Sequence, residues 1–143
     1  MLFQGTVPRQ VTTPNCLCER ELNMELYSVI YRTVEAENLA MVMKSGDLPV
    51  LATPAMIAWM EEASCKIAQT KEGYTTVGIS MNVSHDAPSP LHARIRIVSH
   101  LLEVQGKIYT FEVSAYCGET CIGKGIHKRA AVNRERFLAK LNG

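Results

Sequence analysis

The chain has 143 residues, of which 47% are hydrophobic and 20% are charged, with a formal net charge of +1. This length and apolar content are enough for one compact domain with a buried core. The near-neutral charge argues against a nucleic-acid-binding protein that depends on a strongly basic surface, and no apolar run approaches the roughly 20 residues of a membrane-spanning helix.

The five cysteines are odd in number and irregularly spaced. This pattern favours reduced thiols in the cytoplasm over a framework of disulfides, and no segment has the order of charged, apolar and small residues typical of a signal peptide. Cys16 and Cys18 have no second pair of ligands nearby, so we expect no metal site.

Residues 1–23 differ from the rest of the chain because they show no hydrophobic period. They include the tetrapeptide Leu2-Phe3-Gln4-Gly5, which resembles a viral-protease cleavage site used in expression tags. We interpret residues 1–23 as a flexible N-terminal arm or a segment derived from such a tag, and residues 24–143 as the domain.

A long central helix is the clearest element of the domain, predicted over 54–70. Thr53 is a suitable N-cap and Pro54 suits the first helical position. Apolar residues recur at helical spacing and predict one buried face. At 100° per residue Glu61 falls at the edge of that face, whereas Glu62 falls on the far side and is expected to be solvated.

Residues with strand-forming composition lie on both sides of this helix. Alternating apolar and polar residues predict a first strand over 25–35, followed by a connector over 36–50 with one helical turn near 38–43. Four further strands are predicted over 75–84, 93–104, 107–117 and 121–132, and a terminal helix over 134–141 begins after Asn133. Because the gaps between the last three strands are short, we expect antiparallel hairpins there.

This order of elements has a simple packing solution of the α+β class. One five-stranded antiparallel sheet wraps around the long helix and buries the apolar stripe of the helix against its concave face. Such a sheet leaves two edge strands, which pairing in a two-fold dimer would cover.

Five motifs in order resemble one family. They are the segments 45–54, 60–63, 75–78, 82–90 and 123–129, which read SGDLPVLATP, MEEA, TTVG, NVSHDAPSP and GKGIHKR. From about Glu25 to Lys140 the chain resembles hotdog-fold acyl-CoA thioesterases, in the small branch that includes fluoroacetyl-CoA thioesterase. The resemblance implies hydrolysis of an acyl-CoA thioester, with Thr53, Glu61 and His85 lining the site and Gly78 contacting the acyl carbonyl.

These residue types suit thioester hydrolysis. The reaction needs a nucleophile, a proton shuttle and donors for the charge that develops on the carbonyl oxygen. A histidine such as His85 titrates near neutrality and can act as base and then acid. Glu61 can activate water or attack the carbonyl, and Thr53 can attack or orient the substrate.

The spacing of two of these residues has a geometric consequence. Thr53 and Glu61 lie eight residues apart, which is about 12 Å along a continuous helix. If both lie in one continuous helix, their side chains cannot touch within one subunit. Either Thr53 lies on a loop that folds back, or the site combines residues across a subunit interface. We favour the second arrangement, in a homodimer or a dimer of dimers.

A basic stretch near the C-terminus leaves two interpretations open. Lys124, Lys128, Arg129, Arg134 and Arg136 form either a solvated surface or an attraction for the phosphates of coenzyme A. Arg129 and the neighbouring His127 are our candidates for substrate binding, although a structural role for His127 is equally open. Coenzyme A would be part of the substrate, and no tightly held cofactor is expected.

The resemblance departs from the family in the connector. Fluoroacetate-specific members carry bulky aromatic residues before the catalytic threonine, whereas this chain has Ser45-Gly46-Asp47-Leu48. A short or medium acyl-CoA is therefore a safer expectation than fluoroacetyl-CoA. The alternatives are a non-catalytic protein that binds acyl-CoA and a hotdog enoyl-CoA hydratase.

Overall fold

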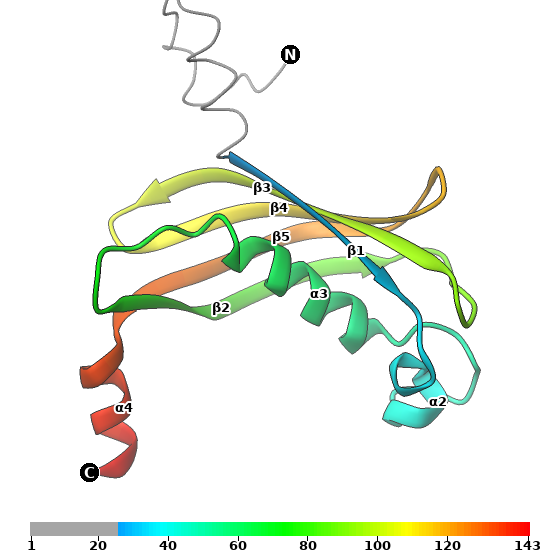
Figure 1. Ribbon diagram of the computed structural model, residues 1–143, viewed down its shortest axis with the longest axis horizontal. Helices are drawn as coiled ribbons and strands as arrows, with labels where there is room; N and C mark the ends of the chain where they lie inside the picture. The colour runs from blue at the N-terminus through cyan, green and yellow to red at the C-terminus, as the bar shows by residue number, and fades with distance from the viewer. Residues whose placement is uncertain (1–25) are drawn as a thin grey trace, which may run out of the picture.

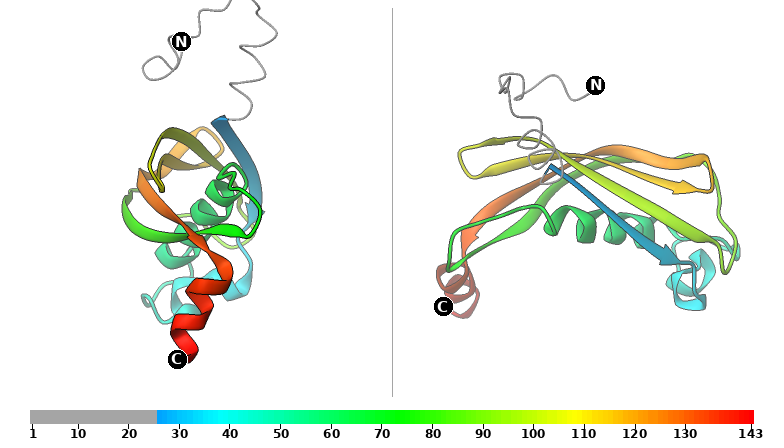
Figure 2. Two further views of the ribbon diagram at one scale, coloured as in Figure 1. Left: turned by 90° about the vertical axis from the view of Figure 1, so that its left-hand side faces the viewer. Right: turned by 45° about the horizontal axis from the view of Figure 1, so that its top comes forward.

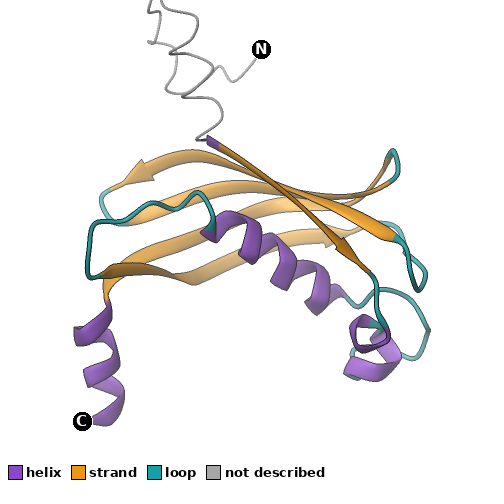
Figure 3. Ribbon diagram, viewed as in Figure 1, coloured by secondary structure: helices purple, strands orange, loops and turns teal. Residues whose placement is uncertain are grey.

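A computed structural model describes residues 26–143. The interpretation of residues 1–23 as an arm, and that of Cys16 and Cys18, concern positions outside the described residues. Within them the elements are β1 (Tyr27–Thr33), the 3₁₀ turn η2 (Ala36–Asn38), α2 (Ala40–Met43), α3 (Thr53–Cys65), β2 (Tyr74–His85), β3 (Arg94–Gln105), β4 (Ile108–Cys117), β5 (Thr120–Asn133) and α4 (Arg134–Asn142) (Figure 3).

The five strands form one antiparallel sheet in the order β1-β3-β4-β5-β2 (Figure 1). The two predicted hairpins are confirmed, and Gly106 and Gly118 in their turns both have φ near +64°, a conformation that glycine adopts without steric cost. β2 and β1 are the edges of the sheet. The register of β2 against β5 shifts between Gly78 and Ser80, which marks a β-bulge.

The core lies between the sheet and α3, as the α+β prediction requires. Figure 2 shows the sheet curving around this helix. Met56 and Met60 of α3 are completely buried, as are Phe111 and Val113 of β4. Each buried side chain of this size stabilises the fold by about 1.5–3 kcal/mol. The helical period therefore predicted the buried face correctly.

The predicted start of the long helix is wrong by one residue. Ala52, not Thr53, is the N-cap: its backbone is extended, and its carbonyl oxygen accepts from the N–H groups of Ala55 and Met56. Ala52 is itself held by a 2.8 Å hydrogen bond from its N–H to the carbonyl of Asn38. The hydroxyl of Thr53 makes no capping bond, which leaves it available for other contacts.

The predicted end is wrong by five residues, since α3 ends at Cys65 rather than Thr70. Beyond it the N–H groups of Lys66, Ile67 and Ala68 each bond to the carbonyl three residues earlier, so the chain continues as tight turns. Periodicity cannot separate such turns from a helix.

The short helices lie at opposite ends of the molecule, α2 near the start of α3 and α4 beyond the end of β5 (Figure 1). The predicted start of α4 is confirmed: Asn133 is its N-cap, and its side chain accepts a 2.9 Å hydrogen bond from the N–H of Arg136. Between residues 26 and 143, no helix has the length and apolar character needed to cross a membrane.

Close pairing of β5 with β2 depends on Gly125. A Cβ at this position would overlap the carbonyl oxygen of Asn82 and the backbone of Val83, so Gly125→Ala should lower the free energy of unfolding by about 3 kcal/mol. Gly118→Ala is the control, because its Cβ would meet nothing within 4 Å and only the positive φ costs about 1–2 kcal/mol. Denaturant unfolding measures both, and an equal or smaller loss for Gly125→Ala would contradict this account.

Candidate functional site

Thr53 and His85 meet at one end of α3. The hydroxyl of Thr53 lies 2.7 Å from Nδ1 of His85. Thr53 is the first residue of α3 and His85 the last of β2, so the contact joins the helix to the edge strand. Because Ala52 serves as the helix cap, the Thr53 hydroxyl is free to make this bond.

The other ring nitrogen of His85, Nε2, is buried and has no hydrogen-bond partner among the described residues. Burial lowers the pKa of His85 from its ordinary 6.5, against an opposing effect of the nearby Asp86 carboxylate. The ring is therefore neutral at neutral pH. In the tautomer where the Thr53 hydroxyl donates to Nδ1, the pair has the geometry of a nucleophile, or a substrate-orienting hydroxyl, beside a base.

Glu61 lies two turns further along α3, beside Gly78 of β2. A Cβ built at Gly78 would stand only 2.8 Å from Oε2 of Glu61. A side chain at this position would require the Glu61 carboxylate to move. The missing side chain thus lets the helix present Glu61 directly against the backbone of the edge strand, where Gly78 is exposed.

Arg129 of β5 fixes the other side of Glu61. Its Nη1 lies 3.9 Å from Oε2 of Glu61. Its Nε donates to the Thr76 hydroxyl at 2.9 Å, its Nη2 donates to the Thr76 carbonyl at 3.1 Å, and the guanidinium is buried. A cation held in this way forms a partly buried ion pair with the Glu61 carboxylate.

His127 completes this network and is 1% exposed. Its Nδ1 donates to the carbonyl of Ser80 at 2.9 Å, and its Nε2 accepts from Nη1 of Arg129 at 3.1 Å. These partners define a neutral ring with the proton on Nδ1. Burial is the main reason that the pKa of His127 lies below 6.5, and Arg129 lowers it further.

The structure thus divides the predicted site residues into two groups. Thr53 and His85 form one pair, while Glu61, Gly78, His127 and Arg129 form a second cluster. Glu62 is not simply solvated as expected, because it pairs with Arg32 of β1. Thr76, which bonds to Arg129, and the Ser80 carbonyl, which bonds to His127, were not predicted. Nothing in the sequence indicates these contacts.

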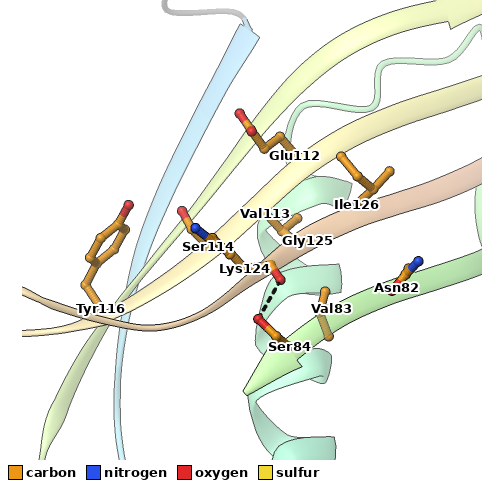
Figure 4. Close-up of a pocket in the computed structure, with 10 residues that line it drawn as sticks. All are labelled: Asn82, Val83, Ser84, Glu112, Val113, Ser114, Tyr116, Lys124, Gly125 and Ile126. Carbon is orange, nitrogen blue, oxygen red and sulfur yellow. Dashed lines mark hydrogen bonds between the residues drawn. The ribbon is translucent and has the colours of Figure 1, made fainter. Parts of the chain in front are cut away.

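Two hollows lie near these residues. A cavity of about 300 Å³ adjoins the Thr53–His85 pair. It is also lined by Ala40 of α2, by the connector between α2 and α3, and by the residues that follow β2. A larger hollow of about 620 Å³ spans β2, β5 and β4 (Figure 4). Ser84 donates there to the carbonyl of Lys124, and none of the predicted site residues lines that hollow.

No group of three or more His, Cys, Asp or Glu side chains in residues 26–143 is arranged to hold a metal ion. The polar groups of the site are side chains and backbone of the protein itself.

Comparison with known proteins identifies the family. The model of the FlK family, described as fluoroacetyl-CoA-specific thioesterase, matches residues 34–135. The chain belongs to this family. The match spans α3 and all the predicted site residues, and it confirms the resemblance seen in the motifs.

Individual relatives agree with this assignment. The chain is 32% identical over 94 residues to the fluoroacetyl-CoA thioesterase of Streptantibioticus cattleyicolor, a match that covers 64% of this chain and 68% of that protein. A crystal structure of the fluoroacetyl-CoA thioesterase FlK superposes with a TM-score of 0.76 at 26% identity, covering 81% of this chain and 92% of the other.

Another similar structure is a Thermus thermophilus member of the thioesterase superfamily. Its TM-score is 0.75 at 25% identity, with 81% of this chain and 88% of the other covered. Structures of FlK variants were solved in complex with fluoroacetate and with fluoroacetate and coenzyme A. The fold is the hotdog fold, and the protein is an acyl-CoA thioesterase, a thioester hydrolase.

The buried His127 should make stability depend on pH. Its pKa is lower in the folded state than the 6.5 of the unfolded chain, so the unfolded state binds more protons and stability falls as pH drops below about 6.5. His127→Gln replaces a titrating acceptor by a neutral one and should reduce this loss. Urea unfolding at about pH 7.5 and about pH 5 measures it, with the exposed His92→Asn as control. Identical pH dependence in the wild type and His127→Gln would contradict the assignment.

Proposed function

We propose that the protein hydrolyses a short or medium acyl-CoA at a site formed by Thr53, Glu61 and His85. The observation that carries the proposal is the 2.7 Å contact between Thr53 and Nδ1 of His85, with Nε2 buried and unpartnered in residues 26–143. A neutral imidazole bonded to a hydroxyl is suited to remove a proton from the attacking oxygen and return it to the leaving sulfur.

Glu61 and Gly78 supply the second half of the site. Gly78 is exposed on the edge strand, where a ligand can approach its backbone, and the adjacent Glu61 carboxylate can orient or activate the attacking group. Arg129 forms an ion pair with Glu61 and is itself bonded to His127. Their predicted direct contact with substrate stays a prediction.

We propose that the two halves come together across a homodimer. Thr53 and Glu61 belong to the same continuous helix and lie eight residues apart, a rise of about 12 Å. β2 is an edge strand, and Gly78, Ile79 and Ser80 on it are exposed. Antiparallel pairing of β2 with its copy would bring the His85 end of one strand toward the Gly78 half of the other.

The proposed activity is tested by coenzyme A release from a panel of acyl-CoA esters that includes fluoroacetyl-CoA. Glu61→Gln and His85→Ala should each lower kcat about 10²–10⁴-fold, because each removes a proton-transfer or positioning group. Glu103→Gln and His92→Asn change exposed residues of the same types and should leave turnover intact. Release is followed by chromatography, since free protein thiols would react with a thiol dye.

Other outcomes of this assay would favour another function. Tight acyl-CoA binding without cleavage would indicate a non-catalytic binding protein, and addition of water to an enoyl-CoA would indicate a hydratase. Turnover that is indifferent to both site variants would overturn the assignment of the residues. The ester hydrolysed best defines the acyl group, and the cytoplasmic location expected from the cysteines stays a prediction.

Mixed dimers test the shared site. We consider a heterodimer of one Thr53→Ala subunit and one Glu61→Ala subunit. If each site takes Thr53 from one subunit and Glu61 from the other, one site of this heterodimer carries both substitutions and the other carries none. Differently tagged subunits allow its purification, and its kcat should recover to about half of the wild-type value. If each site belongs to one subunit, both sites carry a lesion and the heterodimer stays as inactive as the single variants.

A further inference from the structure

A basic and aromatic hollow lies at the end of the molecule opposite the Thr53–His85 pair. It has a volume of about 300 Å³, and the residues that line it include two aromatic ones, Tyr74 and Phe137, and three basic ones, Lys107, Arg136 and Lys140. None of the residues that line it is acidic. The ammonium of Lys71 adds positive charge, 4.7 Å from the centre of the Tyr74 ring.

Backbone hydrogen bonds hold the three segments of this hollow together. Tyr74 begins β2, Lys107 lies in the turn between β3 and β4, and Arg136 and Phe137 belong to α4, all at one end of the sheet (Figure 1). The N–H of Ala131 donates to the carbonyl of Lys107 at 2.8 Å, and the N–H of Arg134 donates to the carbonyl of Gly73 at 3.0 Å. The rings and cations are thus placed by ordered backbone.

Aromatic rings beside several cations suit a ligand with a flat ring and phosphate groups. A base stacks on an aromatic side chain, while Arg and Lys bind phosphate oxygens. Coenzyme A carries an adenine ring and three phosphates at the end remote from its sulfur. We propose that this hollow binds the nucleotide end of the acyl-CoA substrate, an inference that rests on the proposed function.

The spacing along β2 fits this assignment. Tyr74, Thr76 and Gly78 alternate onto one face of the strand, and the register against β5 is regular between them. Tyr74 and Gly78 are four residues apart, or about 13 Å. The pantetheine arm has about thirteen bonds between sulfur and phosphorus, which equals about four residues of extended backbone and spans about 15 Å. A thioester at Gly78 therefore reaches the hollow with its phosphates.

Other residues of the basic stretch are placed differently. Lys124 and Lys128 alternate with the buried His127 along β5 and face the opposite side of the sheet, and Arg129 is buried beside Glu61. Arg136 alone of the cations named in that stretch lines the hollow. The sequence indicated a basic stretch near the C-terminus, but it could not show which of its residues line the hollow. It did not indicate Lys107 or Lys140 at all.

Direct binding of adenosine 3′,5′-bisphosphate, measured by calorimetry, tests the site without any catalysis. Lys107→Ala/Arg136→Ala should weaken binding about tenfold, because two charge-assisted contacts to phosphate are removed. Tyr74→Leu should also weaken binding, because it removes the stacking ring. Lys128→Ala removes one charge from the opposite face and is the control. No binding by the wild type, or an equal loss in Lys128→Ala, would overturn the proposal.

Kinetics separates this proposal from the proposed function. The double variant should raise KM for acyl-CoA about tenfold with kcat unchanged, and it should leave hydrolysis of the matching acyl-N-acetylcysteamine thioester, which has no nucleotide, unaltered. Equal loss on both substrates would contradict a nucleotide site. Bisphosphate binding that depends on these residues in a protein without thioesterase activity would support the hollow and overturn only the proposed function.

Discussion

The rigid spacing of Thr53 and Glu61 along α3 is the constraint on which the rest of the site depends. A buried helix does not bend by the amount needed to join side chains two turns apart, because Met56 and Met60 between them are completely buried against the sheet. Each residue therefore meets a different part of β2, Thr53 the His85 end and Glu61 the Gly78 segment. The proposed homodimer would bring the base, the hydroxyl and the carboxylate to one carbonyl.

The surroundings of Glu61 depend on Gly78, which has no side chain, and on two buried side chains, those of Arg129 and His127. Gly78 makes room for the carboxylate, and Arg129 reaches it from β5 while bonded to Thr76 and His127. His127 is fixed in turn by the Ser80 carbonyl, just past the bulge in β2. A chain of polar contacts thus runs from the bulge of the edge strand through two buried side chains to the Glu61 carboxylate. A buried cation is tolerated here because each of its nitrogens has a polar neighbour.

The polar groups of the proposed site follow a fixed order along the edge strand β2. His85, Gly78 and Tyr74 follow one another along β2 from the α2 end to the α4 end. A neutral imidazole lies at one end, a carboxylate near the middle and a cluster of cations at the other. In the proposed dimer only the part of β2 from Gly78 to Tyr74 lies along one acyl-CoA, from thioester to nucleotide, because the imidazole that acts on that thioester comes from the other subunit. The near-neutral net charge of the chain does not reveal this separation of charged groups along β2, because it sums charges that the fold places in different parts of the molecule.

Sequence alone determined the elements of this protein, since local patterns decide them. The helical period of α3 marked Met56 and Met60 as core, and short glycine turns set the hairpins of an α+β hotdog sheet. The motifs indicated the family and the residue types of the site. The sequence did not determine the ends of α3. Its N-cap is Ala52, whose N–H is bonded to the distant carbonyl of Asn38. Its last residue is Cys65, and the tight turns that follow share the spacing of a helix. Only the tertiary structure decided that Thr53 contacts His85, that Arg129 is buried beside Glu61, and that Lys107 lines one hollow with Arg136 and Lys140. These contacts join residues far apart in the chain, and their partners are chosen by strand order and register, which no local pattern encodes.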